Sequence, residues 1–179
     1  MTAWTSEPVP LDAIRLLAGL REHEVRFVLV GGLAAVAHGY TGATQDADAV
    51  PAYDDENIER LCRALAELGA RRYVHPDRPD REAGGDPAEV ESFGLTVTTL
   101  RTRTAWQFMT DAGPLDVLFA IDGPGGFDSL APRAVTRMVG GHEILVAGLD
   151  DLIESKEASG RDKDLRALGE LRRLRDASR

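Results

Sequence analysis

Apolar and polar positions repeat along the chain with two periods, which predict an alternation of helices and strands. A helix over 10–22 is predicted by apolar side chains at helical spacing, Leu11, Ile14, Leu17 and Leu20. The run 25–30 is short, apolar and rich in β-branched residues, which predicts a buried strand. Gly31 and Gly32 then predict a tight turn that opens a short helix over 33–38.

The remaining pattern continues this alternation to the end of the chain. Further strands are predicted over 46–50, 71–74, 93–100, 104–109, 114–121, 134–139 and 142–146. Further helices are predicted over 54–68, 150–159 and 162–176. The segment 75–90 is rich in Pro, Asp, Gly and Arg and is expected to form a mobile loop. Glycine-rich loops are expected at 122–126 and at the turn between 134–139 and 142–146.

This order of elements predicts an α+β fold, close to α/β, with a mixed β-sheet flanked by helices. We expect a core over 1–147 and a C-terminal helical segment over 148–179 that packs on the core within one structural domain. A chain of 179 residues is long enough to bury a sizeable hydrophobic core.

Composition narrows the class of protein. Hydrophobic residues make up 43% of the chain and charged residues 28%, which is typical of a soluble globular protein. No apolar run approaches the roughly 20 residues of a membrane span, and no signal segment is present, so we expect a cytoplasmic protein with no membrane partner. Cys62 is the only cysteine, which excludes an internal disulfide and a cysteine-rich zinc site, and its helical spacing indicates core packing.

The formal net charge of -9 argues against broad affinity for a polyanion. It leaves open a nucleotide that brings its own magnesium, or an RNA bound through a local basic patch. Such a patch is possible near the C-terminus, where Arg161, Lys163 and Arg166 begin a cluster of basic residues. The alternative is a cluster of charges that only complements the helix dipole.

Two acidic residues on one predicted strand are the first candidates for chemistry. Asp46 and Asp48 are two residues apart, so on a strand their side chains point the same way, roughly 6–7 Å apart. A later acid, Asp116, lies in an apolar run where burial is costly unless a cation or hydrogen bonds satisfy it. Three converging carboxylates can hold two magnesium ions for phosphoryl or nucleotidyl transfer.

The spacing of Asp46 and Asp48 is weak evidence alone, because Asp162 and Asp164 repeat it. A solvated strand edge explains the pair equally well. The context changes this balance, because Gly31 and Gly32 end an apolar strand and would let a phosphate approach the backbone. The turn, the paired acids and the later buried acid are rare in combination.

With these features the chain resembles the nucleotidyltransferase superfamily that includes DNA polymerase beta. The resemblance is carried by residues 27–32 (Phe-Val-Leu-Val-Gly-Gly), 38–39 (His-Gly), 44–48 (Thr-Gln-Asp-Ala-Asp) and 113–118 (Gly-Pro-Leu-Asp-Val-Leu). A later block, over 151–156 and 160–165, resembles the small bacterial proteins related to abortive-infection nucleotidyltransferase toxins. The resemblance spans roughly residues 25–171.

The resemblance implies a role for each matched residue. Asp46, Asp48 and Asp116 would bind two Mg²⁺ ions, or Mn²⁺ in their place, and Asp116 would also help deprotonate the attacking hydroxyl. An NTP such as ATP would be the substrate. The residues implied in binding its phosphates are Gly31, Gly32, Thr44, Lys156, Arg161 and Lys163, with Asp164 orienting Lys156 or the nucleotide.

Four positions depart from the family pattern. Gly32 stands where many members have Ser, and Gly42 stands where an Arg is frequent. Ala47 and Ala49 are smaller than the usual large aliphatic residues, which suggests a tighter sheet.

Three functional hypotheses follow. In the first, the chain transfers an NMP from an NTP to an acceptor hydroxyl on tRNA, a protein or a small molecule. In the second, it is a catalytically inactive module of the same fold that binds a nucleotide or a partner, which the missing cation at Gly42 would permit. In the third, it is the toxin of a toxin–antitoxin pair and has a cognate antitoxin. His38 is expected to be structural, and Lys156 without the resemblance would pass for a solvated lysine.

Overall fold

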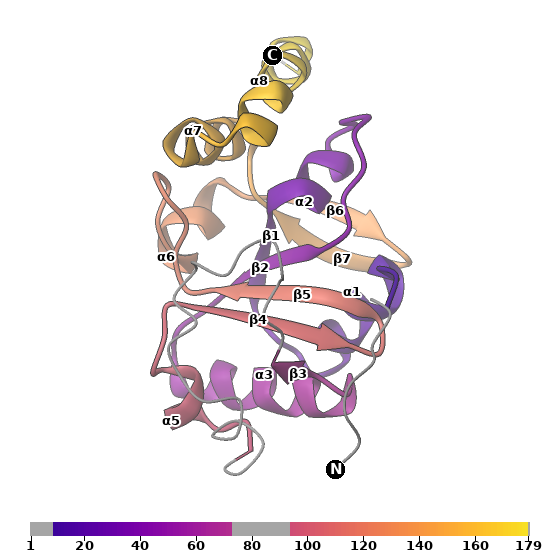
Figure 1. The fold of residues 1–179 in the computed structure, drawn as a ribbon, viewed down its shortest axis with the longest axis vertical. Coiled ribbons are helices and arrows are strands. Elements are labelled where there is room, and N and C mark those ends of the chain that lie inside the picture. The colour runs from indigo at the N-terminus through magenta and orange to yellow at the C-terminus, as the bar shows by residue number, and fades with distance from the viewer. Residues whose placement is uncertain (1–8, 73–93, 179) are drawn as a thin grey trace.

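A mixed sheet of seven strands in the order β3-β4-β5-β2-β1-β7-β6 runs through the molecule (Figure 1). The computed structural model describes residues 9–72 and 94–178. The strands are β1 (Phe27–Val30), β2 (Ala47–Pro51), β3 (Arg71–Arg72), β4 (Ala105–Thr110), β5 (Gly113–Leu118), β6 (Val135–Val139) and β7 (His142–Val146). The helices are α1 (Ala13–Glu22), α2 (Gly31–Ala37), α3 (Asp55–Glu67), α5 (Val97–Leu100), α6 (Phe127–Leu130), the short 3₁₀ turn Ala131–Arg133, α7 (Leu149–Ser159) and α8 (Asp162–Ala177).

The centre of the sheet combines parallel and antiparallel pairs. Strand β2 is antiparallel to β1 and parallel to β5, and β5 is antiparallel to β4. Strand β7 is parallel to β1 and forms an antiparallel hairpin with β6. The mixed sheet with flanking helices confirms the predicted α+β fold.

The hydrophobic core is built from one set of alternating strand positions and from the apolar faces of helices. Leu115, Val117 and Phe108 are fully buried in the sheet. Their neighbours Pro114, Asp116 and Gln107 face the other way, because successive side chains of a strand alternate between the two faces. Helices α1 and α3 pack together and contribute buried side chains at helical spacing, Leu16, Leu17, Leu20, Ile58, Leu61 and Leu65.

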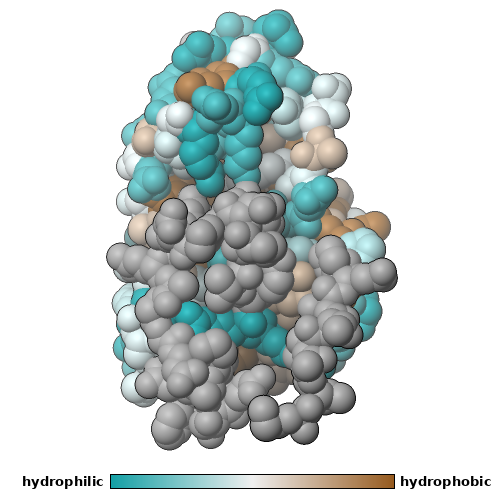
Figure 2. All heavy atoms as spheres, viewed as in Figure 1, coloured by the Kyte–Doolittle hydropathy of each residue, from teal (hydrophilic) through white to brown (hydrophobic). Residues whose placement is uncertain are grey.

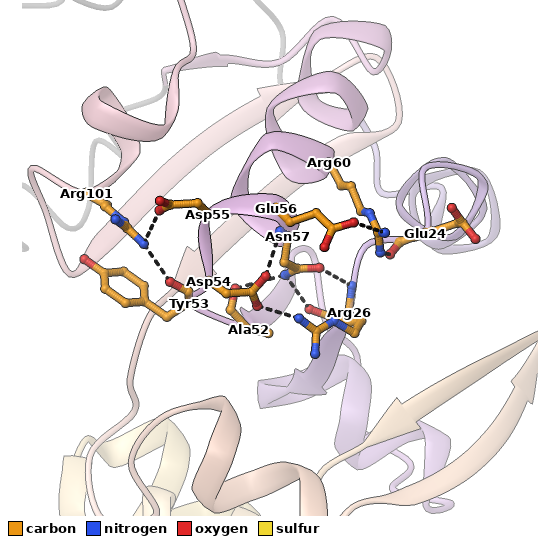
Figure 3. Close-up of polar contacts among 10 residues, drawn as sticks. All are labelled: Glu24, Arg26, Ala52, Tyr53, Asp54, Asp55, Glu56, Asn57, Arg60 and Arg101. Carbon is orange, nitrogen blue, oxygen red and sulfur yellow. Dashed lines mark hydrogen bonds and ion pairs between the residues drawn. The ribbon is translucent and has the colours of Figure 1, made fainter.

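One buried amide joins the antiparallel pair of β1 and β2 to the start of α3 (Figure 3). Asn57 is 1% exposed, and its side-chain nitrogen donates to the carbonyls of Arg26 at 3.0 Å and Ala52 at 2.9 Å. Its side-chain oxygen accepts from the backbone N–H of Arg26 at 2.7 Å. Asp54 caps the same helix by accepting from the Asn57 N–H at 3.1 Å. The ends of β1 and β2 are therefore tied to α3 by side-chain hydrogen bonds.

The strand predicted over 93–100 is wrong in its described part, because Val97–Leu100 forms the short helix α5. The β-branched residues there favour a strand, but Thr96 caps the helix by accepting from the Thr99 N–H at 3.1 Å. The indole of Trp106 also donates to the Leu100 carbonyl at 2.8 Å and satisfies the last turn. These contacts outweigh the local propensity.

Other predicted bounds need smaller changes. The strand predicted over 46–50 begins at Ala47 and ends at Pro51, so Asp46 precedes it. The expected mobile loop over 75–90 lies outside the described residues, as does the second half of 71–74. The hairpin turn is confirmed, with Gly140 and Gly141 at φ of 58° and 86°, a conformation that glycine adopts without strain.

Helices α7 and α8 lie at one end of the molecule, and α3 lies at the opposite end with the sheet between them (Figure 1). Gly160 ends α7 in the left-handed conformation, at φ 60°, and the chain turns there into α8. Helix α7 packs against both α8 and α2. In residues 9–72 and 94–178, no helix is long and apolar enough to cross a membrane.

Candidate active site

A row of four side chains crosses the sheet from β1 to β4 and lines one large cavity. Val30 of β1 is opposite Asp48 of β2, Asp48 is beside Asp116 of β5, and Asp116 is opposite Gln107 of β4. Paired positions place their side chains on the same face of a sheet. All four residues line a cavity of about 1120 Å³. The cavity therefore has a polar row of two carboxylates and one amide across its floor.

The three predicted acids all line this cavity. Asp48 and Asp116 occupy neighbouring strands, whose backbones lie about 4.8 Å apart. Asp116 is only 5% exposed. Asp46 comes from the residue just before β2, where the Thr44 hydroxyl donates to its Oδ1 at 3.1 Å. The register of β2 and β5 thus brings together acids that are far apart in the sequence.

These oxygen donors suit a hard divalent cation by their chemistry. Within the described ranges, however, no three His, Cys, Asp or Glu side chains are grouped closely enough to hold a metal ion in the conformation of this structure. The Asp48 carboxylate lies against α2, where its Oδ2 is 2.0 Å from the position that a Cβ on Gly31 would take. The donor types therefore fit a metal site, and the observed side-chain positions do not yet form one.

Glycine is required at position 31 for two reasons. Its φ is 67°, in the left-handed region that favours glycine. Any side chain there would also collide with the Asp48 carboxylate. The close approach of α2 to β2 thus depends on this residue.

At the start of α2, the hydroxyl of Thr44 occupies the space beside Gly32. A Cβ on Gly32 would lie 2.6 Å from Thr44 Oγ1. The Thr44 hydroxyl therefore occupies the space in which a serine at position 32 would begin. This contact gives a steric reason for the first departure from the family pattern, because a serine at position 32 would collide with Thr44.

The second departure has a similar steric cause. A Cβ on Gly42 would lie 2.2 Å from the ring of Tyr40, which itself lines the cavity. Tyr40 thus fills the space through which an arginine side chain at position 42 would pass. An aromatic ring stands at this wall of the cavity in place of a cation.

Helices α7 and α8 carry a charged cluster, which lines the side of the cavity opposite the acids. Lys156 Nζ donates to Asp164 Oδ1 at 2.9 Å, and Arg161 Nε and the Ser159 hydroxyl donate to Asp164 Oδ2 at 2.6 and 2.7 Å. Burial opposes ionisation of Asp164, but the hydrogen bonds from Lys156, Ser159 and Arg161 outweigh it and lower its pKa to about 2. Asp164 therefore contacts Lys156, whereas a contact with a nucleotide, the alternative that the resemblance implies, stays a prediction.

Among residues 9–72 and 94–178, the cations at the cavity wall all come from this cluster region. Lys156, Arg161 and Lys163 line the cavity, and they lie within or between α7 and α8. Figure 2 shows mainly hydrophilic side chains over these two helices. Arg166 does not line the cavity, and its Nε donates to the Asp162 carbonyl at 3.2 Å. Of the basic patch predicted from the sequence, Arg161 and Lys163 therefore line the cavity and Arg166 does not.

Two residues expected to be structural have structural surroundings. His38 Nε2 lies 2.8 Å from the Ala147 carbonyl oxygen, and burial lowers its pKa. Cys62 is half-buried in α3, and burial raises the pKa of its thiol to about 11. A thiol with so high a pKa is a poor nucleophile at neutral pH.

Gln107 and Tyr40 both line the cavity, and neither was predicted as a site residue from the sequence. Gln107 is the one polar residue within an otherwise apolar part of β4, and that interruption was the signal that could have revealed it. Tyr40 had no comparable signal, because its role depends on the glycine two positions later.

Comparisons with solved structures identify the fold. The chain superposes on the lincosamide antibiotic adenylyltransferase LnuA with lincomycin bound, with a TM-score of 0.59, 11% identity, and coverage of 92% of this chain and 99% of that one. It superposes on the antibiotic-resistance factor ANT(2'')-Ia with a TM-score of 0.53, 14% identity, and coverage of 91% and 86%. No model of a protein family and no curated protein matches the sequence. Likeness at this level of identity shows the fold, which is the nucleotidyltransferase fold.

Proposed function

We propose that this chain, which has the nucleotidyltransferase fold, is an enzyme that moves an NMP from an NTP to an acceptor hydroxyl. The observation that carries the proposal is the pairing of Asp48 with Asp116 on adjacent strands, in a cavity whose opposite wall holds Lys156 and Arg161. Acidic side chains on one wall and cationic side chains on the other suit a metal-bound triphosphate, which needs both.

Asp46, Asp48 and Asp116 would hold the divalent cations, Mg²⁺ or Mn²⁺. When bound, these ions neutralise charge on the phosphates and position the reacting groups. The oxygen of the acceptor attacks the α-phosphorus, the bond from that phosphorus to the pyrophosphate breaks, and the hydroxyl proton passes to the Asp116 carboxylate. Pyrophosphate leaves with the pair of electrons of the broken bond.

The phosphates would lie between α2 and the ends of α7 and α8. There Gly31 and Gly32 would present their backbone, and the Thr44 hydroxyl stands beside Gly32. Lys156, Arg161 and Lys163 would neutralise phosphate charge from the other wall. Asp164 would hold Lys156 in place, since it binds both Lys156 and Arg161.

A small-molecule acceptor is better supported than a macromolecule. ANT(2'')-Ia has been seen with adenylyl-2''-tobramycin, at a TM-score of 0.51 and 14% identity to this chain, and LnuA with lincomycin. The net charge of -9 also disfavours a large polyanion such as tRNA. Acceptors on tRNA or protein, and a role as a toxin with an antitoxin partner, remain predictions from the resemblance of the late sequence block.

The test is incorporation of label from each NTP, labelled at the α-phosphate, in the presence of Mg²⁺ and a panel of acceptors. The variant Asp46→Asn/Asp48→Asn is expected to lose incorporation, because it lacks two of the three carboxylates that would hold the cations. Asp162→Asn is the matched control, since Asp162 belongs to the other pair with this spacing and does not line the cavity. Incorporation that survives in the double variant would contradict the proposal.

The inactive binding module is the second candidate, and the absence of a cation at Gly42 favours it. Titration calorimetry separates the two. Tight binding of NTP with no transfer to any acceptor in a broad panel would support the inactive module. Transfer at a rate that depends on Asp46 and Asp48 would exclude it.

A further inference from the structure

The cavity floor extends beyond the acids onto a surface formed by β4 and β5. Gln107 is directly opposite Asp116, at a cross-strand position where side chains lie about 5 Å apart. It stands on the side of Asp116 that is away from Asp48, since β5 lies between β2 and β4. Gln107 is therefore the next polar group in the row after Asp48 and Asp116.

The amide of Gln107 is half-buried and makes no side-chain hydrogen bond with any residue in 9–72 and 94–178. Among the described residues no buried side-chain nitrogen or oxygen lacks a hydrogen-bond partner, so the Gln107 amide is reached by solvent from the cavity. In the rest of this wall, polar groups have found partners, as Thr110 has in the Gly113 carbonyl at 2.7 Å. An unpartnered amide that faces a cavity is a ready hydrogen-bonding group for a ligand.

Apolar side chains flank Gln107 along the same face of the sheet. The pair Ala105 and Leu118 lies on one side of it, and the pair Met109 and Pro114 on the other. All four line the cavity. This surface, the four residues with Gln107 at the centre, would contact an apolar molecular body on both sides of one hydrogen bond.

Charge is distributed unequally between the two parts of the cavity. The cations that line it, among the described residues, are Lys156, Arg161 and Lys163 of the α7–α8 wall. The part lined by β4, β5 and the loop after β5 has no Lys or Arg within the described ranges, and it has one additional acid, the exposed Asp122. An anionic acceptor would find only repulsion there, while a neutral or cationic one would not.

We propose that the Gln107 surface binds the acceptor, and that the acceptor is an uncharged or cationic small molecule with a hydroxyl and an apolar body. This inference rests on the proposed nucleotidyl transfer. The Gln107 amide N–H donates to the acceptor hydroxyl oxygen, which leaves the proton of that hydroxyl directed toward Asp116. Gln107 would thus be a binding residue that selects which hydroxyl is presented to the acid.

The first experiment compares acceptors of different charge with the wild-type protein and NTP labelled at the α-phosphate. The probes are lincomycin and tobramycin as cationic compounds, methyl glucoside as an uncharged one, glucose 6-phosphate as an anionic one, and total tRNA. Label on a cationic or uncharged probe supports the inference. Label only on glucose 6-phosphate or tRNA overturns it and leaves the proposed transfer intact.

The second experiment uses Gln107→Met, which keeps the size of the side chain and removes its hydrogen bond. The KM for the acceptor is expected to rise about tenfold, the upper range for one lost hydrogen bond, with the Kd for NTP unchanged. Thr136→Val is the matched control, because it replaces an exposed polar side chain on β6 at the far edge of the sheet. An unchanged acceptor KM, or a change in NTP affinity instead, overturns the inference.

Two further measurements cover the remaining outcomes. If Gln107→Met proves unstable in thermal unfolding, Ala105→Gln replaces it, since a longer side chain narrows the same surface and should also raise only the acceptor KM. If no probe is labelled, calorimetric titration of lincomycin and tobramycin into the NTP-bound protein decides. Binding that Gln107→Met weakens supports the inference, and no binding to the wild type overturns it.

Discussion

The two walls of the cavity are built in opposite ways. At the α7–α8 wall, charged side chains are joined in one cluster in which Asp164 binds Lys156, Arg161 and Ser159. At the β4–β5 floor, the central polar group, Gln107, has no side-chain partner among the described residues, and its neighbours are apolar. One wall is fixed by its own hydrogen bonds, and the other is left open for contacts with a ligand.

This difference indicates which part of a substrate each wall would recognise. A triphosphate is the same in every NTP, so a fixed set of cations serves all of them at no cost in reorganisation. An acceptor must be distinguished from similar molecules, and unpaired polar groups on an apolar surface do this best, because a wrong molecule leaves them unsatisfied. Variants of the two walls should therefore change different measured quantities.

The largest effect is expected at the boundary between the walls. Asp116→Asn should lower kcat by about a thousandfold, the range for loss of a positioned general base, while changing NTP affinity much less. Single-turnover kinetics and calorimetry measure the two quantities separately. A kcat within tenfold of the wild type would show that Asp116 takes no part in the reaction. The two walls would then not meet at a residue that acts in catalysis.

Lys156→Met should destabilise the α7–α8 wall more than any change on the floor. Asp164 is 3% exposed and would keep its charge with one cation fewer, which costs about 3 kcal/mol for a buried ion pair. Chemical denaturation measures the loss of stability, and NTP affinity should fall with it. Gln107→Met is the comparison, and its stability should stay within about 1 kcal/mol of the wild type.

The same cluster predicts how stability changes with pH. The pKa of Asp164 is about 2 in the folded chain against 3.8 for a free carboxyl, so folding favours its ionised form. This contribution, about 2 kcal/mol by linkage, is fully present above pH 3.8 and is lost as pH falls toward 2. Asp164→Asn should flatten the acid limb of stability measured by denaturation between these values. If the stability of that variant falls at low pH as steeply as that of the wild type, other groups cause the pH dependence.

The smallest effect is expected where α2 meets Thr44. Gly32→Ser restores the residue frequent in the family but should weaken NTP binding, because its Cβ would lie 2.6 Å from the Thr44 hydroxyl. Thr44→Ala in the same chain should relieve the clash. A double-mutant cycle on NTP affinity should give a coupling of about 1 kcal/mol between the two positions. If the effects of the two substitutions on NTP affinity are additive, the serine at position 32 and the Thr44 hydroxyl do not compete for the same space.

Sequence patterns predicted the fold well where periodicity and chemistry agreed. Asp116 could be singled out because an acid is costly in an apolar run, whereas the register that places it beside Asp48 is known only from the structure. The helix Val97–Leu100 was predicted as a strand, since its cap and the indole of Trp106 lie outside any local pattern. Contacts formed between distant segments override local propensity in this way.

The site was predicted less completely than the fold. Its acids, glycines and cations are residue types whose chemistry can be recognised in a sequence. Gln107 and Tyr40 matter because of what lies beside them, Asp116 across the sheet and Gly42 along the loop. Such roles arise from three-dimensional neighbours, and only Gln107 left a signal in the sequence, as a polar residue within an apolar strand.

The row of side chains from Val30 to Gln107 also bears on how the protein folds. The contacts of Asp164 with Lys156 and Arg161 are local in sequence, so they can form as soon as α7 and α8 exist. The pairing of β2 with β5 is parallel and joins distant segments, and contacts of this kind close late because long loops must be ordered first. During refolding, the cation cluster should therefore be in place before Asp48 and Asp116 meet. Helical signal should return first, and the two halves of the proposed catalytic centre should be united only in the final step.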